Sequence, residues 1–262
     1  MSTDHEIKIV GIIQARLGSS RLPSKVLMEL MGRPMLSYML ERVSKVEDLH
    51  EIVVATTTQQ QDDAIEAFCR TNHTKVFRGS ENDVLDRYFQ AASAYHADII
   101  LRLTADCPLI DPRVVDKIIH AFLKKYPDID FAGNVKPATF PDGLDTEVFT
   151  MDALRRAWTE AKNPLDREHV TPYFYDEPGR FRTLNITAER DYSKYRITVD
   201  HAEDFQVIEN IIRNLYSKKR PFSFEEIVAY LDQHQEVMTL NQSFNRNPWY
   251  VQYQKQKENK CT

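Results

Sequence analysis

Apolar runs alternate with amphipathic segments along the first half of the chain. The runs are almost continuously apolar, a pattern typical of strands buried on both faces. The segments between them carry apolar residues at helical spacing, as at Met35, Met39 and Val43. Strands that alternate with helices predict parallel pairs joined by right-handed crossovers. The predicted strands are residues 7–13, 51–57, 75–79 and 98–104, and the predicted helices are residues 31–46, 62–73, 80–96 and 112–127.

The second half of the chain shows a looser pattern of short extended stretches and helices. Residues 165–181 predict a helix that is broken near Pro172 or Pro178, because proline cannot continue a helix interior. Residues 181–188 and 195–200 predict two strands that could pair with each other. The other predicted elements are a strand at 130–135, an extended segment within 136–150, and helices at 151–161, 202–218 and 222–234.

Together these elements predict an α/β fold with a mostly parallel sheet and flanking helices. The 262 residues are enough for one large domain. We expect a single domain over residues 1–240 and a polar C-terminal appendage over residues 241–262. Ligands of such sheets bind beyond the carboxyl ends of the strands. Four loops are predicted to meet there, at residues 16–25, 56–58, 78–80 and 105–108.

Composition and charge limit the partners that the chain could bind. A net charge of -5 argues against a general nucleic-acid binder, so an anion site requires a local concentration of positive charge. No apolar run approaches the roughly 20 residues that span a bilayer, and the polar start MSTDHEIK lacks a signal-peptide core, so we expect a cytoplasmic protein. Cys69, Cys107 and Cys261 are too scattered for a disulfide framework or a zinc site. The seven glycines form neither of the two common nucleotide fingerprints.

Three cations follow the first predicted strand directly. Arg16, Arg21 and Lys25 lie in the stretch RLGSSRLPSK, together with several small residues. Arginine supplies fork-shaped pairs of hydrogen bonds to phosphate, lysine supplies a point charge, and hydroxyl and backbone groups add donors. We predict that this loop binds a polyphosphate. The alternative is a solvated basic loop, which would be unusual directly after a buried strand in an acidic protein.

Two acids also end apolar runs, Asp106 in RLTADCPL and Asp200 in ITVD. A carboxylate that faces a phosphate site is repelled unless a cation lies between the two. Mg²⁺ bridges carboxylate and phosphate oxygens, so we predict that both acids bind magnesium. Asp106 could instead be a turn residue before Pro108, and Asp200 could be a helix N-cap with Glu203 completing a capping box.

Two further motifs could bind a second substrate. The extended segment PDGLDTEVF carries Asp142, Asp145 and Glu147, whose carboxylates could bind sugar hydroxyls or ammonium groups. The alternative is a turn that leads into an edge strand. DREHVTPY carries Arg167 and His169, which could pair with a substrate carboxylate, although a surface helix with salt bridges fits equally well.

Several motifs together resemble the cytidylyltransferases that make CMP-sugars. The opening stretch IIQARLGSSRLPSKVLMELMGRPML is similar to their N-terminal signature. FRGSENDVLDRYFQAA, RLTADCPLID, PDGLDTEVF, DREHVTPY and TVDHAEDF resemble the spore-coat polysaccharide branch of this family. The likeness covers residues 7–234, which is nearly the whole chain.

The resemblance implies the nucleotide-diphospho-sugar transferase fold, which is Rossmann-like and of the GT-A type, and a homodimer. It implies catalytic roles for Arg16, Lys25, Asp106 and Asp200, with the two acids as ligands of Mg²⁺. Relatives carry glutamine, which helps to recognise cytosine, near the position of Thr104. The phosphate site is therefore better defined than the base site. The implied nucleotide-binding residues are Ala15, Arg16, Leu17, Gly18, Ser19, Ser20, Arg21, Lys25, Arg78, Ser80 and Thr104.

These inferences predict a magnesium-dependent cytidylyltransferase that uses CTP and a sugar acid of the nonulosonic or ketodeoxy type. The acceptor hydroxyl attacks the α-phosphate of CTP, pyrophosphate leaves, and the CMP-sugar serves surface or spore-coat polysaccharide synthesis. One alternative is a glycosyltransferase of related fold that uses a nucleotide-sugar donor, and another is a non-catalytic nucleotide-binding protein. The cationic loop suits a triphosphate better than a sugar diphosphate, and the presence of both acids argues against a loss of catalysis. The predicted substrate-binding residues are Asp142, Asp145, Glu147, Arg167 and His169.

Overall fold

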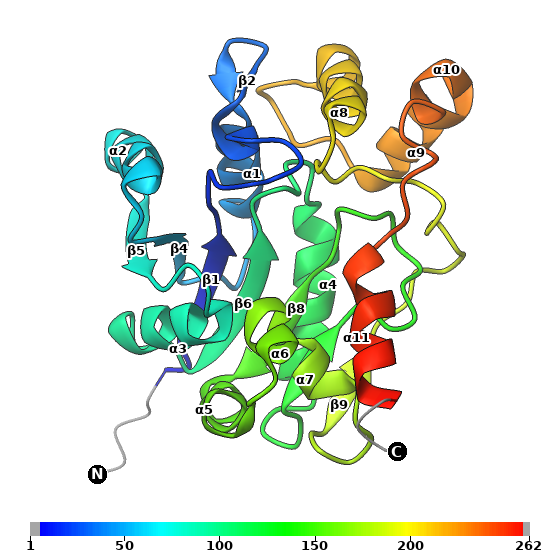
Figure 1. Ribbon diagram of the computed structural model, residues 1–262. Coiled ribbons are helices and arrows are strands. Elements are labelled where there is room, and N and C mark those ends of the chain that lie inside the picture. Colours follow the sequence, from blue (N-terminus) through cyan, green and yellow to red (C-terminus); the bar gives the residue numbers. More distant parts are fainter. Residues whose placement is uncertain (1–5, 259–262) are drawn as a thin grey trace.

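A seven-stranded sheet forms the centre of the protein (Figure 1). The computed structural model describes residues 6–258. The strands lie in the order β5-β4-β1-β6-β8-β7-β9. They are β1 Ile9–Gln14, β4 Glu51–Thr57, β5 Lys75–Gly79, β6 Ile99–Thr104, β7 Phe131–Gly133, β8 Glu147–Thr150 and β9 Thr183–Asn185, and a separate hairpin pairs β2 Glu29–Leu30 with β3 Arg33–Pro34.

The α-helices are spread along the whole described chain. They are α1 Met35–Val43, α2 Asp63–Thr71, α3 Val84–Ala94, α4 Pro112–Leu123, α5 Met151–Glu160, α6 Pro164–His169, α7 Pro172–Tyr175, α8 Ala202–Leu215, α9 Phe224–Gln233, α10 Gln235–Met238 and α11 Pro248–Glu258. Two 3₁₀ turns, η1 Lys25–Leu27 and η2 Gln60–Asp62, belong to loops. None of the helices in residues 6–258 is long and apolar enough to cross a membrane.

The sheet has a parallel part and an antiparallel part. β5, β4, β1 and β6 run parallel, as predicted, whereas β8 runs antiparallel to β6. Gln14 at the end of β1 pairs with Thr104 at the end of β6, so the loops after these strands leave the sheet side by side. Because β8 runs against β6, with Glu147 opposite Arg102, the chain that enters β8 reaches the same edge. The prediction of a mostly parallel sheet is confirmed.

Two apolar layers cover the two faces of the sheet. Ile9 and Ile13 of β1 belong to the layer under α1, α4, α8 and α9, while Val10 and Ile12 belong to the layer under α3, α5 and α7. All four side chains are at most 2% exposed. Burial on both faces explains why the predicted strands are continuously apolar rather than alternating.

One predicted strand is absent. Residues 195–200 run extended but form no assigned strand, and β9 pairs with β7 instead. This segment instead bonds to two loops. The amide of Ile197 donates to the carbonyl of Asp142 at 2.7 Å, and the amide of Val199 donates to the carbonyl of Asp106 at 2.8 Å. The predicted helix break is confirmed: α6 ends before Val170, whose φ of 65° is incompatible with a continued helix.

The C-terminal segment, expected from sequence as a polar appendage over residues 241–262, contains α11. Tyr253 of this helix is fully buried, and its hydroxyl donates to Asp166 of α6 at 2.7 Å. The hydroxyl of Tyr250 donates to Asp176, just beyond α7, at 2.5 Å. These contacts fix α11 to the helices beside β8 (Figure 1). Cys261, weighed above as a possible disulfide or zinc residue, lies outside the described residues.

Gly143 allows two segments to approach closely, and its replacement is the first test. Its φ is +113°, and a Cβ atom there would lie 2.7 Å from the carbonyl carbon of Ile197. Gly143→Ala should therefore lower the free energy of unfolding by roughly 3 kcal/mol, from backbone strain plus overpacking. Urea unfolding measures this change.

The matched control for Gly143→Ala is Gly32→Ala. Gly32 also has positive φ, +78°, but a Cβ there would meet no atom within 4 Å. This variant should lose only about 1–2 kcal/mol, from backbone strain alone. Equal losses in the two variants would show that the approach to Ile197 is unimportant.

Candidate active site

A cavity of about 640 Å³ opens beyond the carboxyl ends of β1 and β6. Of the four loops expected to meet there, those after β1 and β6 line the cavity, and the turns at residues 56–58 and 78–80 do not. Segments from the second half of the chain complete the wall. The lining residues come from segments 14–26, 81–87, 102–107, 135–147, 165–175, 196–200 and 247–249.

A buried carboxylate shapes the loop after β1. Asp62 has no exposed surface, accepts a hydrogen bond from the amide of Leu17 at 2.7 Å, and accepts another from the Thr57 hydroxyl. The amide of Ser24 donates to the carbonyl of Leu17 at 3.0 Å and closes the loop. The loop therefore has a fixed shape, and it presents seven of the predicted nucleotide-binding residues to the cavity together with β6: Ala15, Arg16, Ser19, Ser20, Arg21, Lys25 and Thr104.

Arg78 and Ser80 lie beside the cavity rather than in it. The guanidinium of Arg78 donates to Asp63 at 2.6 Å and to Glu66 at 2.8 Å, so it holds α2 against β5. The carbonyl of Ser80 accepts from Arg87 of α3 at 2.6 Å, and Arg87 does line the cavity. The sequence did not single out Arg87, because an arginine within an amphipathic helix gives no sign that it is buried.

Lys25 lies between the two acids that end apolar runs. Its Nζ donates to Asp106 at 3.1 Å, to Asp200 at 2.9 Å and to the carbonyl of Val199 at 2.6 Å. Burial alone would lower the pKa of Lys25, but the two carboxylates outweigh it and the pKa is raised. Burial would likewise raise the pKa of Asp106, but the Lys25 ammonium outweighs it and the pKa is lowered. Both partners are therefore held in their charged forms.

The same two carboxylates fit a magnesium ion. Mg²⁺ is usually bound by one or two carboxylates together with water and substrate phosphates. The side chains of Asp106 and Asp200 keep 28% and 16% of their surface exposed, on the side of the cavity. In residues 6–258 no group of three or more His, Cys, Asp or Glu could enclose a metal. The donor set therefore suits an ion that is shared with phosphates.

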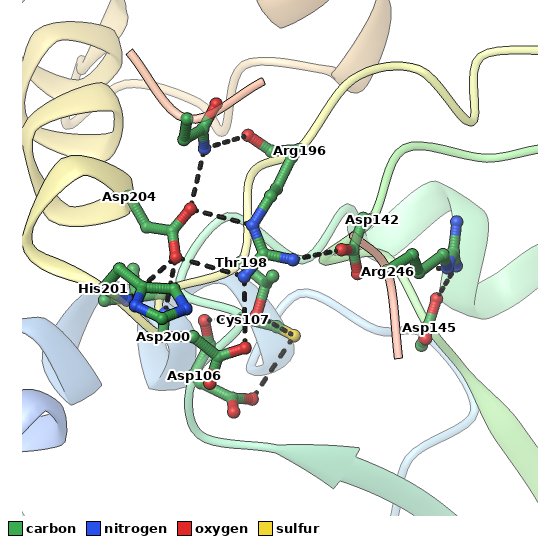
Figure 2. A network of polar contacts seen from close by, with 12 residues as sticks. Asp106, Cys107, Asp142, Asp145, Arg196, Thr198, Asp200, His201, Asp204 and Arg246 are labelled. Carbon is green, nitrogen blue, oxygen red and sulfur yellow. Dashed lines mark hydrogen bonds and ion pairs between the residues drawn. The ribbon is translucent and has the colours of Figure 1, made fainter. Parts of the chain in front are cut away.

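Arg196 joins three carboxylates behind this pair (Figure 2). Its guanidinium donates to Asp142 at 2.6 Å, to Asp204 at 2.8 Å and to Asp200 at 3.1 Å. Asp204 also accepts from the amides of Asp200 and His201, both at 2.9 Å, so Asp204 and not Glu203 completes the capping box of α8. The pKa of Arg196 is raised because its carboxylate partners outweigh the effect of burial.

Asp142 is a buried carboxylate that shares its arginine partner, Arg196, with two other acids. It is 7% exposed, Asp145 lies nearby, and Arg196 divides its single charge among three carboxylates. Burial and the Asp145 charge raise the pKa of Asp142 to about 7, against the opposing effects of Arg246 and Arg196. The negative charge of Asp142 is therefore poorly stabilised by its surroundings.

The other predicted acids are paired with arginines that the sequence did not single out. Glu147 of β8 accepts from Arg102, its cross-strand neighbour in β6, and Asp145 accepts from Arg246. Burial raises the pKa of Glu147 although Arg102 opposes this. The sequence pattern of an extended segment does not identify such distant partners. Arg102 lies 45 residues from Glu147 in sequence, and Arg246 lies 101 residues from Asp145.

His169 lines the cavity and Arg167 does not. The Arg167 guanidinium donates to Asp83 at 2.6 Å and to the carbonyl of Trp158 at 3.0 Å, so it ties α6 to α3 and α5. The His169 ring is stacked on Trp249 at 3.7 Å between centroids. Burial, and then the Arg102 charge, lower the pKa of His169 to about 4, so its ring is neutral at physiological pH.

Comparisons with known proteins identify the family of this chain. A sequence model described as cytidylyltransferase matches residues 10–255. The chain is 34% identical to the spore coat polysaccharide biosynthesis protein SpsF of Bacillus subtilis over 241 residues, which are 88% of this chain and 97% of SpsF. It is also 34% identical over 113 residues to the 3-deoxy-manno-octulosonate cytidylyltransferase of Geobacter metallireducens, or 43% of this chain and 44% of that protein.

A solved structure shares the fold over most of the chain. It is a cytidylyltransferase from Leptospira borgpetersenii, which superposes with a TM-score of 0.85 and is 36% identical. The alignment covers 89% of this chain and 97% of that protein. The predicted family resemblance and fold are confirmed.

Asp142→Asn tests the charge balance of the cavity. A carboxyl group with a raised pKa stabilises the folded state fully below the pKa of the unfolded chain, near 4, and this stabilisation is lost as the pH rises through about 7. From pH 5 to pH 8 the wild-type protein should therefore lose roughly 2–3 kcal/mol more than the variant in its free energy of unfolding. Urea unfolding at both pH values measures this difference.

The control for Asp142→Asn is Asp152→Asn on α5, where the side chain is 91% exposed and pairs only with Arg155. An exposed pair of this kind contributes about 0–1 kcal/mol, so this variant should follow the wild-type pH dependence. The charge argument fails if Asp142→Asn also follows the wild-type curve.

Proposed function

The chain belongs to the cytidylyltransferase family and is a nucleotidyltransferase, and we propose that it transfers the cytidylyl group of CTP to a sugar acid. The acceptor hydroxyl forms a bond to the α-phosphorus, the bond to the β,γ-pyrophosphate breaks, and the hydroxyl proton is lost to solvent. The observation that carries the proposal is the position of Lys25, between Asp106 and Asp200 and behind a loop of further cations.

The cations of the loop would bind the triphosphate. Arg16 is exposed to the cavity and has no ion-pair partner in the described chain, while Arg21 is 46% exposed and bonded to Asp200 at 2.7 Å. Arg87 adds a buried guanidinium on the other side of the loop. Preorganised cations of this kind stabilise the negative charge that moves to the leaving pyrophosphate, and they need no reorganisation during the reaction.

We assign Mg²⁺ to Asp106 and Asp200. Bound there, the ion would neutralise phosphate charge and polarise the α-phosphate. The Lys25 ammonium supports this role, because it keeps the pKa of Asp106 below its ordinary value and so keeps the carboxylate available to a cation. Arg196 orients Asp200 from behind, through a contact of 3.1 Å.

For the acceptor we propose a nonulosonic or ketodeoxy sugar acid that is destined for a surface polysaccharide. The names of the two matched relatives, a spore coat polysaccharide protein and a 3-deoxy-manno-octulosonate cytidylyltransferase, support this choice. Asp142, Asp145, Glu147 and His169 line the cavity on the side of β8 and α6 and would bind the acceptor. We also propose a homodimer, as the family resemblance implies.

The nucleotide can be identified by thermal unfolding. CTP with magnesium, at about 100 times its dissociation constant, should stabilise the protein by about 2.7 kcal/mol and raise Tm by roughly 5–10 °C. ATP, GTP and UTP should give smaller shifts.

Lys25→Met should lower the rate of pyrophosphate release at least about 10²-fold, by analogy with the loss of one charge-stabilising donor. The control is Lys45→Met, which changes an exposed lysine.

An absence of any shift with all four nucleotides would contradict the proposed function. Equal shifts with all four would contradict the assignment to CTP alone.

Asp200→Asn tests the metal separately. The amide keeps the size of the side chain but loses the charge that binds a cation, so the magnesium concentration for half-maximal turnover should rise at least about tenfold. Glu203→Gln is the matched control, because Glu203 is exposed in the first turn of α8 and does not line the cavity. Full turnover of Asp200→Asn at wild-type magnesium concentrations would exclude Asp200 as a ligand.

A further inference from the structure

The strand order divides the cavity into two sides. The loop after β1 lies on one side of the loop after β6, which carries Asp106, and β8 lies on the other side. In phosphoryl transfer the attacking and leaving oxygens lie roughly in line across the phosphorus. If pyrophosphate leaves over the cationic loop, the acceptor must enter from the side of β8. In Figure 2, Asp142, Arg246 and Asp145 extend away from Arg196 in one direction, and Asp106 and Asp200 lie in another.

The end wall of the β8 side comes from the C-terminal segment. Asn247, Pro248 and Trp249 line the cavity, although they follow the loop residues by more than 220 positions in sequence. The Trp249 indole lies nearly parallel to the His169 ring, with 12° between the planes. The two rings therefore lie face to face, one from α6 and one from α11, and together they form part of the cavity wall, which we call the His169–Trp249 stack.

Contacts on both sides of Trp249 hold the stack in place. Before it, Arg246 donates to the carbonyl of Phe140 at 2.9 Å and pairs with Asp145. After it, Tyr253 is fully buried and donates to Asp166 of α6, the helix that also carries His169. A wall fixed in this way loses little conformational entropy when a ligand packs on it.

The chemistry around the stack suits a sugar ring. Binding sites for small polar ligands combine flat apolar surface with a few polar groups that fix the orientation. The side of the stack that lines the cavity would provide the apolar surface for the C–H face of a ring. Glu168, Asp145 and Glu147 line the same side and provide carboxylate oxygens, which accept hydrogen bonds from hydroxyl groups. The neutral imidazole of His169 has one nitrogen that donates and one that accepts.

We propose that the His169–Trp249 stack is the surface on which the ring of the acceptor sugar packs, so that the C-terminal segment 246–253 selects the acceptor. This inference rests on the function proposed above and adds to the acceptor site Trp249, which the sequence motifs did not include. It assigns a role to the segment that follows the last family-like motif of the chain.

Steady-state kinetics test the role of Trp249. Trp249→Ala should raise the KM for the acceptor at least about tenfold and leave the KM for CTP within about twofold of wild type. Trp249→Phe should restore most of the affinity for the acceptor, because it keeps a flat ring. Val251→Ala is the matched control, since Val251 is 61% exposed on the same helix. Tm measurements establish that each variant is folded.

The sequence contains only two tryptophans, which allows a second measurement that does not depend on catalysis. Trp158 is stacked on Phe89 and donates to Asp86, away from the cavity. In the Trp158→Phe variant, the remaining emission reports on Trp249. Addition of 3-deoxy-manno-octulosonate or N-acetylneuraminate, with CTP present and magnesium omitted, should change this emission in a saturable way.

The outcomes distinguish this inference from the proposed function. If a sugar acid supports pyrophosphate release with the same acceptor KM in wild type and Trp249→Ala, the inference is overturned and the function stands. If KM for CTP rises as much as KM for the acceptor, the inference is also overturned. If no sugar supports pyrophosphate release, the proposed function fails. In that case a saturable change in Trp249 emission on addition of a sugar would still support the stack as a sugar site, and no change would overturn it.

Discussion

The guanidinium of Arg196 is the contact on which the geometry of the cavity depends. It binds Asp142 from the segment before β8, Asp200 at the end of its own segment and Asp204 in the first turn of α8. Its own carbonyl accepts from Asn241 at 3.1 Å, and Asn241 also donates to Asp204. Through its side chain and its carbonyl, Arg196 therefore connects its own segment to the chain before β8, to α8 and to Asn241. Loss of one partner from such a buried network leaves a charge uncompensated, so its geometry is strongly constrained.

Lys25 connects this network to the cationic loop after β1. It shares Asp200 with Arg196 and adds Asp106, so the carboxylates lie in a row with cations between them. Burial, and then the Asp145 charge, raise the pKa of Asp142, because the arginines near it do not offset the cost of burying its negative charge. A cavity that holds both carboxylates and cations favours the entry of a cation together with an anionic substrate, because the charges of the two then neutralise each other.

The sequence predicts the side of the cavity formed by β1 and β6 far better than the side formed by β8. Arg16, Lys25 and Asp106 follow buried parallel strands directly, and strand ends meet at one edge by geometry alone, so their meeting could be foreseen. Arg196 could not be placed in this way, because an arginine between apolar residues in YRITVD gives the same pattern as an exposed strand position.

The structure also brings together residues whose partners are distant in sequence. Glu147 meets Arg102 only because β8 runs antiparallel to β6, and apolar periodicity does not encode strand direction. Trp249 meets His169 because Arg246 and Tyr253, on either side of it, hold this segment beside β8 and α6. The aromatic residues of α11 span only one helical turn and are followed by polar residues, so the pattern was too short to predict how the helix packs.

Because β8 runs antiparallel to β6, the two sides of the cavity are attached to different parts of the fold. The cationic loop after β1 and the loop that carries Asp106 are attached to the ends of β1 and β6, at the centre of the sheet. Groups on the opposite side are carried by the chain before β8, by α6 and by α11, at one margin of the fold. Substitutions, insertions or an exchanged terminus at that margin leave the central strands and their loops unchanged. Under the proposed function, the residues that bind the acceptor could therefore change while the residues that act on the nucleotide stay the same.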